Sequence, residues 1–307
     1  MFRNVRFYRV STPWPESEHE LSDILAESEF KPCGPLTERR SGWESPSLVS
    51  DGLLCRRVGG ADLLQLRTQS RLLPAAAIQE ALVDRVNDFK SRMQQDPSRR
   101  VMRRLKDETR DELLPKSLLK SERMRGFFLL GERLLGIDAA SENKAERFLD
   151  QLRAAFKGFE FTPVSYNRPL GDLMTAIFLG EDVAHFTAAQ ECRMRDLSEK
   201  TAVATWKNIN LADPSIRQHV VDGMKLTHLA VEYDHLLSCV VSEEGVISKL
   251  RFADGDAADV TDEEDPLARQ DSEFVLLTGI MRRLITDFEK LLDGFASAAT
   301  PKQANAA

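Results

Sequence analysis

The sequence predicts a mixed α/β fold, because segments with strand patterning and segments with helix patterning alternate along it. Its 307 residues exceed the common domain size of about 100–150 residues, which favours two compact units or one core with a large projection. Hydrophobic residues make up 42% of the chain and charged residues 30%, a globular balance that excludes a collagen-like or wholly disordered protein. No apolar run approaches the ~20 residues of a transmembrane helix, so a membrane bundle is excluded as well.

The first part of the chain predicts strands with one helix among them. Bulky residues predict a strand over 2–10, and apolar residues at helical spacing predict a helix from about Glu16. Residues 53–58 and 61–67 flank Gly59-Gly60. Two glycines between apolar runs are typical of a hairpin, because both turn positions can then adopt positive φ.

Residues 74–118 predict two helices that pair as an antiparallel hairpin. From Ile78 to Met93, apolar residues recur at steps of four, four, three and four, a narrow seam closer to a coiled coil than to a core helix. Pro97 breaks the first helix and Ser98 can cap the second. A first helix of about 20 residues would be roughly 30 Å long, so we expect a projection.

The remaining chain predicts further strands and helices. Strands expected over 127–130 and 133–137 flank Gly131-Glu132, which predicts a type II′ hairpin. Ser141 can cap a helix that ends at Gly158 before a strand over 159–166. Later segments predict helices over 170–180, 213–223 and 274–295, strands over 226–233, 236–241 and 246–252, and an acidic loop over 254–266. We therefore expect a central α/β domain (1–73 with 119–168), a projecting helical hairpin (74–118) and a C-terminal α/β domain (169–307).

The cysteines and the N-terminus indicate a cytoplasmic protein. The four cysteines lie far apart and form no CxxC pair: Cys33, Cys55, Cys192 and Cys239. Charge interrupts the first apolar stretch, so no signal peptide is readable. We expect reduced thiols in the cytoplasm.

Charge is divided unevenly along the chain. The net charge is −7, but residues 1–125 hold 23 Lys/Arg and 19 Asp/Glu, a balance of +4, which leaves −11 for residues 126–307. A positive region on a negative body indicates an oriented electrostatic surface, without saying what it binds.

Four cations align on the second helix of the predicted hairpin, at Arg99, Arg103, Lys106 and Arg110. At about 100° per residue they lie within a sector of roughly 40–60°, about 120° from the apolar seam, so they need not be buried. Such a stripe could contact successive phosphates with a salt-dependent, sequence-independent attraction.

A plainer interpretation of this stripe is a solvated helix face. Four carboxylates on the same helix can form i,i+4 pairs with the arginines: Asp107, Glu108, Asp111 and Glu112. No aromatic residues interleave the stripe, and no zinc finger or major-groove reader is visible, so single-strand stacking and base-specific readout lack support. Spacing alone leaves both interpretations open.

Signatures of catalysis and cofactor binding are missing. The chain has no GxGxxG, GxxxxGK[ST] or GxSxG motif, and its five histidines are scattered. The aspartates of the acidic loop resemble a calcium loop, but the turn glycine and the bidentate glutamate are out of place: Asp254, Asp256, Asp259 and Asp262. We predict no catalytic residue, no metal site and no cofactor. A nuclease would need clustered carboxylates around a metal ion, and the acidic loop is the only candidate for such a site.

Several short segments, in order and nearly end to end, resemble the RdgC family of bacterial recombination-associated proteins. They are the run 2–10, Phe30-Lys31-Pro32-Cys33-Gly34 with Gly42-Trp43, Leu72-Leu73-Pro74, Leu113-Leu114-Pro115-Lys116, Lys144-Ala145-Glu146, Lys249-Leu250-Arg251-Phe252 and the run 274–285. The resemblance implies a DNA-binding protein and not an enzyme. It also implies a horseshoe-shaped subunit whose two copies close into a ring-shaped homodimer around double-stranded DNA, associate with the nucleoid and restrain RecA-dependent recombination.

The resemblance also implies two dimer contacts. One is made by the tip of the helical projection, and Leu118 stands where a family member can carry an aromatic residue that packs across this contact. The other lies in the C-terminal half around Lys207-Asn208, where Trp206 departs from the family pattern. A compact chain of this length has a radius of gyration of about 19 Å, so one subunit could hardly wrap a duplex, whereas two copies related by a twofold axis could enclose it.

In such a ring, basic residues would line the hole and acidic residues would face outward. Our candidates for the DNA-contacting lining are Arg3, Arg99, Arg103, Lys106, Arg110, Lys116, Lys144, Arg153, Lys207, Lys249 and Arg251. The alternative hypothesis is a protein-interaction scaffold that acts through the projection, in which these charges only keep the surface solvated.

Overall fold

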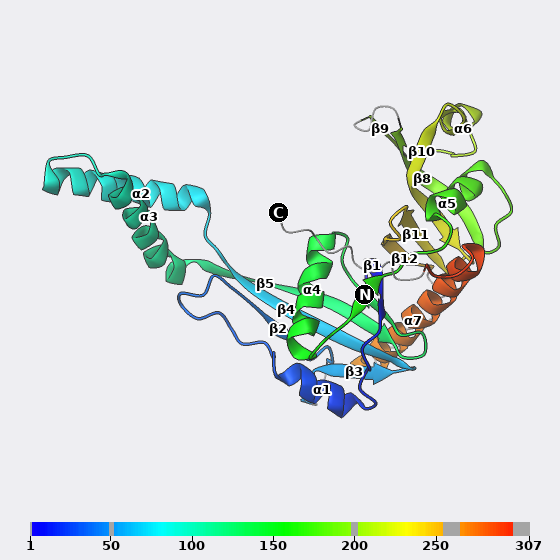
Figure 1. The fold of residues 1–307 in the computed structure, drawn as a ribbon, viewed down its shortest axis with the longest axis horizontal. Helices are drawn as coiled ribbons and strands as arrows, with labels where there is room; N and C mark the ends of the chain where they lie inside the picture. The colour runs from blue at the N-terminus through cyan, green and yellow to red at the C-terminus, as the bar shows by residue number, and fades with distance from the viewer. Residues whose placement is uncertain (1, 49–51, 198–201, 254–264, 297–307) are drawn as a thin grey trace.

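The computed structural model describes residues 2–48, 52–197, 202–253 and 265–296. Figure 1 shows a central body of strands and helices from which the helices α2 (Ala75–Met93) and α3 (Arg99–Leu113) project to one side. At the opposite end a second group of strands carries α5 (Leu170–Leu179) and α6 (Pro214–Val221). The prediction of a mixed α/β fold is confirmed.

The strands form one twelve-stranded sheet in which the described pairs are antiparallel. Along its main path the order is β2-β4-β5-β6-β1-β12-β11-β10-β8-β9, with β3 beside β4 and β7 beside β1. Seven strands belong to the N-terminal half: β1 (Asn4–Val10), β2 (Arg39–Trp43), β3 (Cys55–Val58), β4 (Ala61–Leu72), β5 (Leu118–Leu129), β6 (Leu134–Ile137) and β7 (Phe161–Pro163). Five belong to the C-terminal half: β8 (Phe186–Asp196), β9 (Val203–Lys207), β10 (Met224–Tyr233), β11 (Leu237–Ser242) and β12 (Ile247–Phe252).

Strand β1 joins the two halves of this sheet. Its first residues pair with β12, with Asn4 opposite Ser248, whereas residues 6–9 pair with β6 and residues 8–10 pair with β7. The N-terminal strand therefore pairs with strands of both halves and helps to hold the C-terminal strands against the central ones.

Different helices cover the two faces of the central strands. Val5 and Phe7 of β1 belong to a core with α5, α6 and α7 (Pro266–Leu291). Tyr8 and Val10 belong to a second core with α1 (Glu18–Ala26) and α4 (Glu142–Ala155). Successive residues of a strand face opposite sides, so the two-residue period of β1 supplies both cores.

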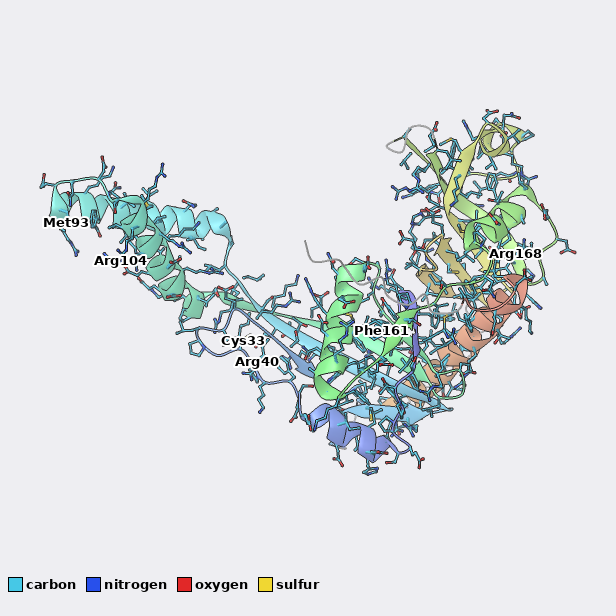
Figure 2. All side chains as sticks on the ribbon, in the orientation of Figure 1. Cys33, Arg40, Met93, Arg104, Phe161 and Arg168 are labelled. Carbon is cyan, nitrogen blue, oxygen red and sulfur yellow. The ribbon has the colours of Figure 1, made fainter. Side chains whose placement is uncertain are left out.

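The projection has very little core of its own. Strands β2, β4 and β5 form the arm that leads to it, and Met93 marks its far end (Figure 2). Along α2 and α3 only Leu82, Leu105 and Thr109 are buried. This sparse burial agrees with the narrow apolar seam that the sequence predicts.

Arg71, near the end of β4, fixes the root of the projection. Its guanidinium donates hydrogen bonds to the backbone carbonyls of Leu114 at 3.0 Å and of Ser117 at 3.3 Å, just beyond α3. It also donates to the carbonyl of Gly34 at 3.0 Å. One side chain thus ties the end of the helical hairpin to the arm and to the loop beside it.

The sequence missed part of the sheet. Strands β2, β8 and β9 were not predicted, and β5 begins at Leu118, well before the predicted start at Phe127. The first six residues of β5, which pair with β4 in the arm, are exposed. An exposed strand carries polar residues on both faces, so the alternation that reveals a half-buried strand is absent.

One predicted turn is correct and another is wrong. Gly59 and Gly60 both have positive φ, 58° and 73°, in a tight hairpin between β3 and β4, as predicted. The β5–β6 connection is not a type II′ turn on Gly131-Glu132. Instead, four residues separate the strands, Gly131 lacks the positive φ that a type II′ turn requires at its first position, and Arg133 adopts the left-handed conformation with φ of 54°. The Arg133 side chain donates to the carbonyl of Thr12, just beyond β1, at 2.7 Å.

A Gly136→Ala substitution in β6 is expected to destabilise the protein by about 1–3 kcal/mol or more, because overpacking a filled core costs that much. An added Cβ would lie 2.3 Å from Cζ of Phe127, a fully buried ring that packs edge-on against Phe2 and Phe7. Urea unfolding measures the loss. Gly131→Ala is the matched control, because its Cβ would meet no atom within 4 Å; equal effects of the two substitutions would contradict the packing argument.

All four cysteines are buried thiols. Burial raises the pKa of the Cys192 thiol to about 11, so this thiol is neutral at physiological pH. Within the described ranges, no helix is long and apolar enough to cross a bilayer.

Candidate nucleic-acid interface

The basic stripe of α3 is exposed and largely free of carboxylate partners. Helix α3 begins at Arg99, where the Ser98 hydroxyl accepts a hydrogen bond from the Val101 amide at 3.4 Å, as the sequence predicts. In the described part of the chain, Arg99, Arg103 and Lys106 form no ion pair, while Arg110 pairs with Glu38. Three aligned cations are therefore available to an anionic ligand.

The carboxylates of the projection mostly bind other cations. Glu108 accepts from Arg104 at 3.5 Å on its own helix, and Glu112 binds Lys116 at 3.0 Å. Arg85 of α2 also reaches Glu112, which ties the two helices together. The expected i,i+4 pairs thus form outside the stripe, and they do not neutralise its first three members.

A second cationic surface lies on the C-terminal strands. Cys192, Met194, Val231 and Cys239 point into the core beneath α5 and α7, so their neighbours along the strands point to the other face. In Figure 1, α5 and α6 lie on the far side of these strands from the projection. The uncovered face, which we call the open face, is therefore on the projection's side of the strands.

Several predicted cations come together on or beside the open face. Lys207 of β9 is the cross-strand neighbour of Glu191 of β8, and Arg251 of β12 is the neighbour of Ser238 of β11. Lys249 reaches the same glutamate at 2.6 Å. Arg3 lies next to this group, because its carbonyl accepts a hydrogen bond from the Leu250 amide at 3.1 Å. Residues far apart in the sequence thus form one basic region.

The remaining predicted cations have local partners. Lys144 at the start of α4 pairs with Glu122 of β5 at 2.6 Å. Arg153 on the same helix binds Glu146 at 2.6 Å and stacks 4.6 Å above the ring of Phe161. The charge of these two side chains is locally compensated, unlike that of Arg99, Arg103 and Lys106.

Sequence reasoning missed Arg193, an exposed cation of the open face. It lies on β8 beside Glu191, and its cross-strand neighbours are Thr205 and His228. The signal that could have found it is alternation, because buried Cys192 and Met194 flank it. Desolvation and the nearby Arg193 charge lower the pKa of His228, so this histidine adds no charge at neutral pH.

The predicted dimer-contact residues lie at opposite ends of the sheet. Leu118 is 76% exposed where β5 begins, beside its cross-strand partner Leu72, at the root of the projection and not at its tip. Trp206 packs against the core, with its ring centroid 5.0 Å from that of His219. Lys207 ends the edge strand β9, and Asn208 follows it with a positive φ of 55°.

Glu44 clamps the arm through two arginines. Its carboxylate accepts hydrogen bonds from Arg67 at 2.8 Å and from Arg123 at 2.6 Å. Burial raises the pKa of Glu44, but the hydrogen bonds and charges of the two arginines outweigh burial and hold its pKa below the ordinary value. A carboxyl of this kind stabilises the fold above its unfolded pKa, and the stabilisation disappears as the pH falls through the folded pKa.

Because of this clamp, we expect Glu44→Gln to be less stable than the unmodified protein at neutral pH and to lose less stability on acidification below about pH 4.3. Urea unfolding at neutral and acidic pH measures both effects. Parallel acid curves for the two proteins would contradict a role for this carboxyl.

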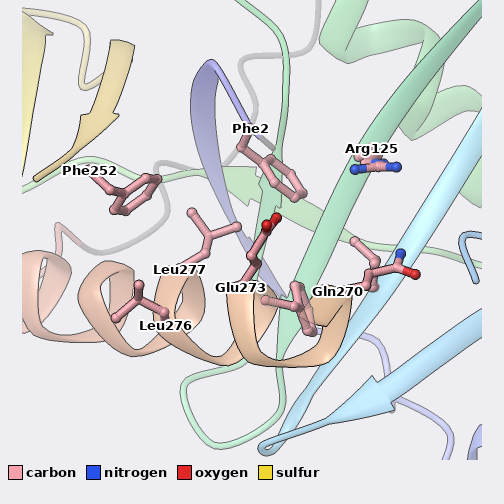
Figure 3. Close-up of a pocket in the computed structure, with 9 residues that line it drawn as sticks. Phe2, Arg125, Phe252, Gln270, Glu273, Leu276 and Leu277 are labelled. Atoms are coloured by element: carbon pink, nitrogen blue, oxygen red, sulfur yellow. The ribbon is translucent and has the colours of Figure 1, made fainter. Parts of the chain in front are cut away.

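A cavity of about 70 Å³ separates the start of α7 from the sheet. Figure 3 shows Phe2, Leu277, Phe252, Arg125 and Glu273 among the residues that line it. Ligand pockets in proteins usually enclose about 300–1,000 Å³, so this space is too small for a nucleotide or cofactor.

A family model described as "Putative exonuclease, RdgC" matches residues 1–295. The chain belongs to the RdgC family. The recombination-associated protein RdgC of Pseudoalteromonas atlantica is 29% identical over 282 residues, which cover 90% of this chain and 92% of that protein. The protein of the same name from Haemophilus influenzae strain PittGG is 30% identical over 298 residues, 96% of this chain and 97% of that protein.

The descriptions of the RdgC family differ on enzymatic activity. The family model is described as a putative exonuclease, whereas the curated relatives are named as recombination-associated proteins and not as enzymes. Among the residues described by the structure, no group of three or more His, Cys, Asp or Glu side chains is arranged to hold a metal ion. The acidic loop that we named as the nuclease candidate, with Asp254, Asp256, Asp259 and Asp262, lies outside the described residues.

Proposed function

We propose that this RdgC family member binds double-stranded DNA without sequence preference. The observation that carries the proposal is the stripe of α3, where Arg99, Arg103 and Lys106 are exposed, aligned and without an ion-pair partner in the described chain. Guanidinium and ammonium groups in a row neutralise successive phosphates, an interaction that reads no bases. In a family of recombination-associated proteins, double-stranded DNA is the ligand that such a surface would bind.

Two copies close around the duplex as a ring in this proposal. Each horseshoe-shaped subunit consists of the central domain (1–73 and 119–168), the projection (74–118) and the C-terminal domain (169–307). The exposed Leu118, with Leu72 beside it, supplies apolar surface for one contact. The edge strand β9, with Trp206, Lys207 and Asn208 at its end, supplies the other, since its outer backbone edge has no neighbouring strand in the described sheet.

The hole of the ring is lined by cations of the stripe and the open face: Arg3, Arg99, Arg103, Lys106, Arg193, Lys207, Lys249 and Arg251. Arg110 and Lys116 extend the stripe, while the partners of Lys144 and Arg153 favour structural roles for these two residues. Excess acid in residues 126–307 faces outward, which keeps the ring negative overall and positive where DNA passes.

Restraint of RecA-dependent recombination follows from occupancy. A duplex enclosed by rings is a poor partner for a recombinase filament, and no direct contact with RecA is needed. The protein then acts in the cytoplasm on nucleoid DNA, without catalysis.

Binding curves over a range of salt concentrations test the proposal. We expect affinity for a random duplex to fall steeply with salt, with unrelated duplexes competing equally. Linear and circular duplexes of the same sequence then separate simple binding from enclosure, since a closed ring leaves a circle more slowly than a line with free ends. Equal dissociation from both would contradict the ring.

The same preparation tests the two competing functions. A protein-interaction scaffold would show no co-migration with DNA at moderate salt. An exonuclease would shorten linear duplex in the presence of Mg²⁺ or Mn²⁺, whereas we expect the length to stay constant.

A further inference from the structure

An ion pair on the open face links strands that are not neighbours. Lys249 on β12 places its Nζ 2.6 Å from a carboxylate oxygen of Glu191 on β8. Strands β10 and β11 lie between β12 and β8, and adjacent strands are spaced about 4.8 Å apart. The two side chains therefore meet above the sheet after reaching across roughly 14 Å of it.

The backbone at Lys249 is shaped for this reach. Lys249 has a positive φ of 54°, a conformation that side chains other than glycine adopt rarely. The register between β11 and β12 shifts beside it, from Ser238 opposite Arg251 to Val240 opposite Ser248. Bulges of this kind re-aim a side chain, and strained backbone of this kind gathers at functional sites.

A second lysine converges on the same carboxylate from the other side. Lys207, on the edge strand β9, has its Nζ 4.0 Å from an Oε atom of Glu191. The lysine side chains are 59% and 53% exposed for Lys207 and Lys249, whereas that of Glu191 is 25% exposed. One carboxylate thus holds two of the cations that we assign to DNA, at a surface that solvent can reach.

We propose that Glu191 occupies the place of a DNA phosphate between Lys207 and Lys249 and competes with DNA for both lysines, so that in the unmodified protein these two phosphate contacts form in only part of the complexes. This inference rests on the proposed function, and it assigns to Glu191 the role of limiting affinity. A carboxylate and a phosphate offer the same charged oxygen acceptors to a lysine. Exposed ion pairs are weak, so a phosphate can replace the carboxylate without loss of the fold.

The substitution Glu191→Gln tests this exchange, since it removes the competing charge and keeps the size of the side chain. Each added phosphate contact steepens the slope of log affinity against log salt by about 0.9. When the salt concentration falls from 1 M to 0.1 M, the affinity of the variant should therefore rise by a further factor of about eight, compared with the rise for the unmodified protein. We expect at least one added contact. Glu232→Gln is the matched control, because Glu232 is exposed on the same face and forms no ion pair within the described residues.

The outcomes separate the possible explanations. A steeper slope for Glu191→Gln, with the Glu232→Gln slope unchanged, supports the proposal. Equal gains in both variants would reduce it to a general effect of net charge and overturn it. Tighter dimers by sedimentation equilibrium with an unchanged salt slope would overturn it too, by assigning Glu191 to the contact at Lys207. If the unmodified protein binds duplex and Glu191→Gln has the same affinity and salt slope, this inference alone is overturned. If the unmodified protein does not bind duplex at all, the proposed function is overturned as well.

Discussion

Replacing Arg99, Arg103 and Lys106 together with glutamine is expected to abolish most of the salt dependence of duplex binding that the projection contributes. Each phosphate contact adds about 0.9 to the slope of log affinity against log salt. Loss of three contacts therefore lowers the slope by about 2.7. When the salt concentration rises fourfold, the affinity of the variant then falls by a factor that is roughly 40 times smaller than the factor for the unmodified protein. The effect is large because these cations are aligned, exposed and free of ion pairs in the described structure.

The matched control removes the same charge from other faces of the projection. Lys90, Arg100 and Arg104 are exposed on α2 and α3, and two of them already have carboxylate partners, Asp96 for Lys90 and Glu108 for Arg104. The triple glutamine variant at these positions should keep most of the slope. Fluorescence anisotropy over a salt series compares the two variants, and identical slopes would remove the stripe from the mechanism.

Arg110 is left out of the substituted set for a structural reason. It pairs with Glu38 in the loop beside the arm, so its removal would leave that carboxylate unpaired near the root of the projection. A change in DNA affinity could then come from a displaced projection, and the result would not measure a phosphate contact.

The second large effect is expected for Asp62→Asn, which breaks a buried ion pair. The Asp62 carboxylate is fully buried and accepts both Nε and Nη2 of Arg57, at 2.6 and 2.7 Å. It also accepts the indole Nε1 of Trp14 at 2.7 Å, and that ring stacks 3.9 Å from Phe128. This one carboxylate thus holds the hairpin β3–β4 against the chain that leads into α1.

Removing one partner of a buried pair leaves the other charge uncompensated, at a cost of about 3–5 kcal/mol. A domain is stable by about 5–15 kcal/mol in total, so the melting temperature should fall sharply. Thermal and urea unfolding measure this change. A loss below about 1 kcal/mol, the scale of an exposed pair, would mean that Asp62 is not the anchor described above.

Glu122→Gln provides the comparison for Asp62→Asn. It breaks the ion pair with Lys144, in which the lysine side chain is 49% exposed and the glutamate side chain 45% exposed. Exposed ion pairs contribute about 0–1 kcal/mol to stability. The contrast between the two variants tests burial as the cause, because both remove one carboxylate charge from an ion pair.

Local patterns in the sequence predicted the elements with the strongest periodicity. The projection is an example, since the seam from Ile78 to Met93 and the cap at Ser98 depend only on residues within a few turns. The turn at Gly59-Gly60 is another, because two adjacent glycines supply positive φ by themselves. The sequence did not predict the exposed strands. The part of β5 that begins at Leu118 pairs with β4 without burying a hydrophobic face, so no alternation of apolar and polar residues marks it.

The candidate interface divides in the same way. The alignment of Arg99, Arg103 and Lys106 follows from the helical repeat, so the sequence alone revealed it. The sequence alone could not reveal that Arg3, Lys207 and Lys249 lie near one another, because these residues meet only after β1 pairs with β12 and β9 pairs with β8. Arg193 went unnoticed because its strand did, and the Glu191 ion pairs could not be read from residues 16 and 58 positions away.

By itself, the sequence determined the mixed fold class, the helical projection and its basic stripe, because helix period, turn residues and capping act over a few residues. Only the tertiary structure decided which cations are free and which are held by a carboxylate. An ion pair depends on side chains brought together by strand pairing and packing, and their distances in space are not encoded in the local pattern.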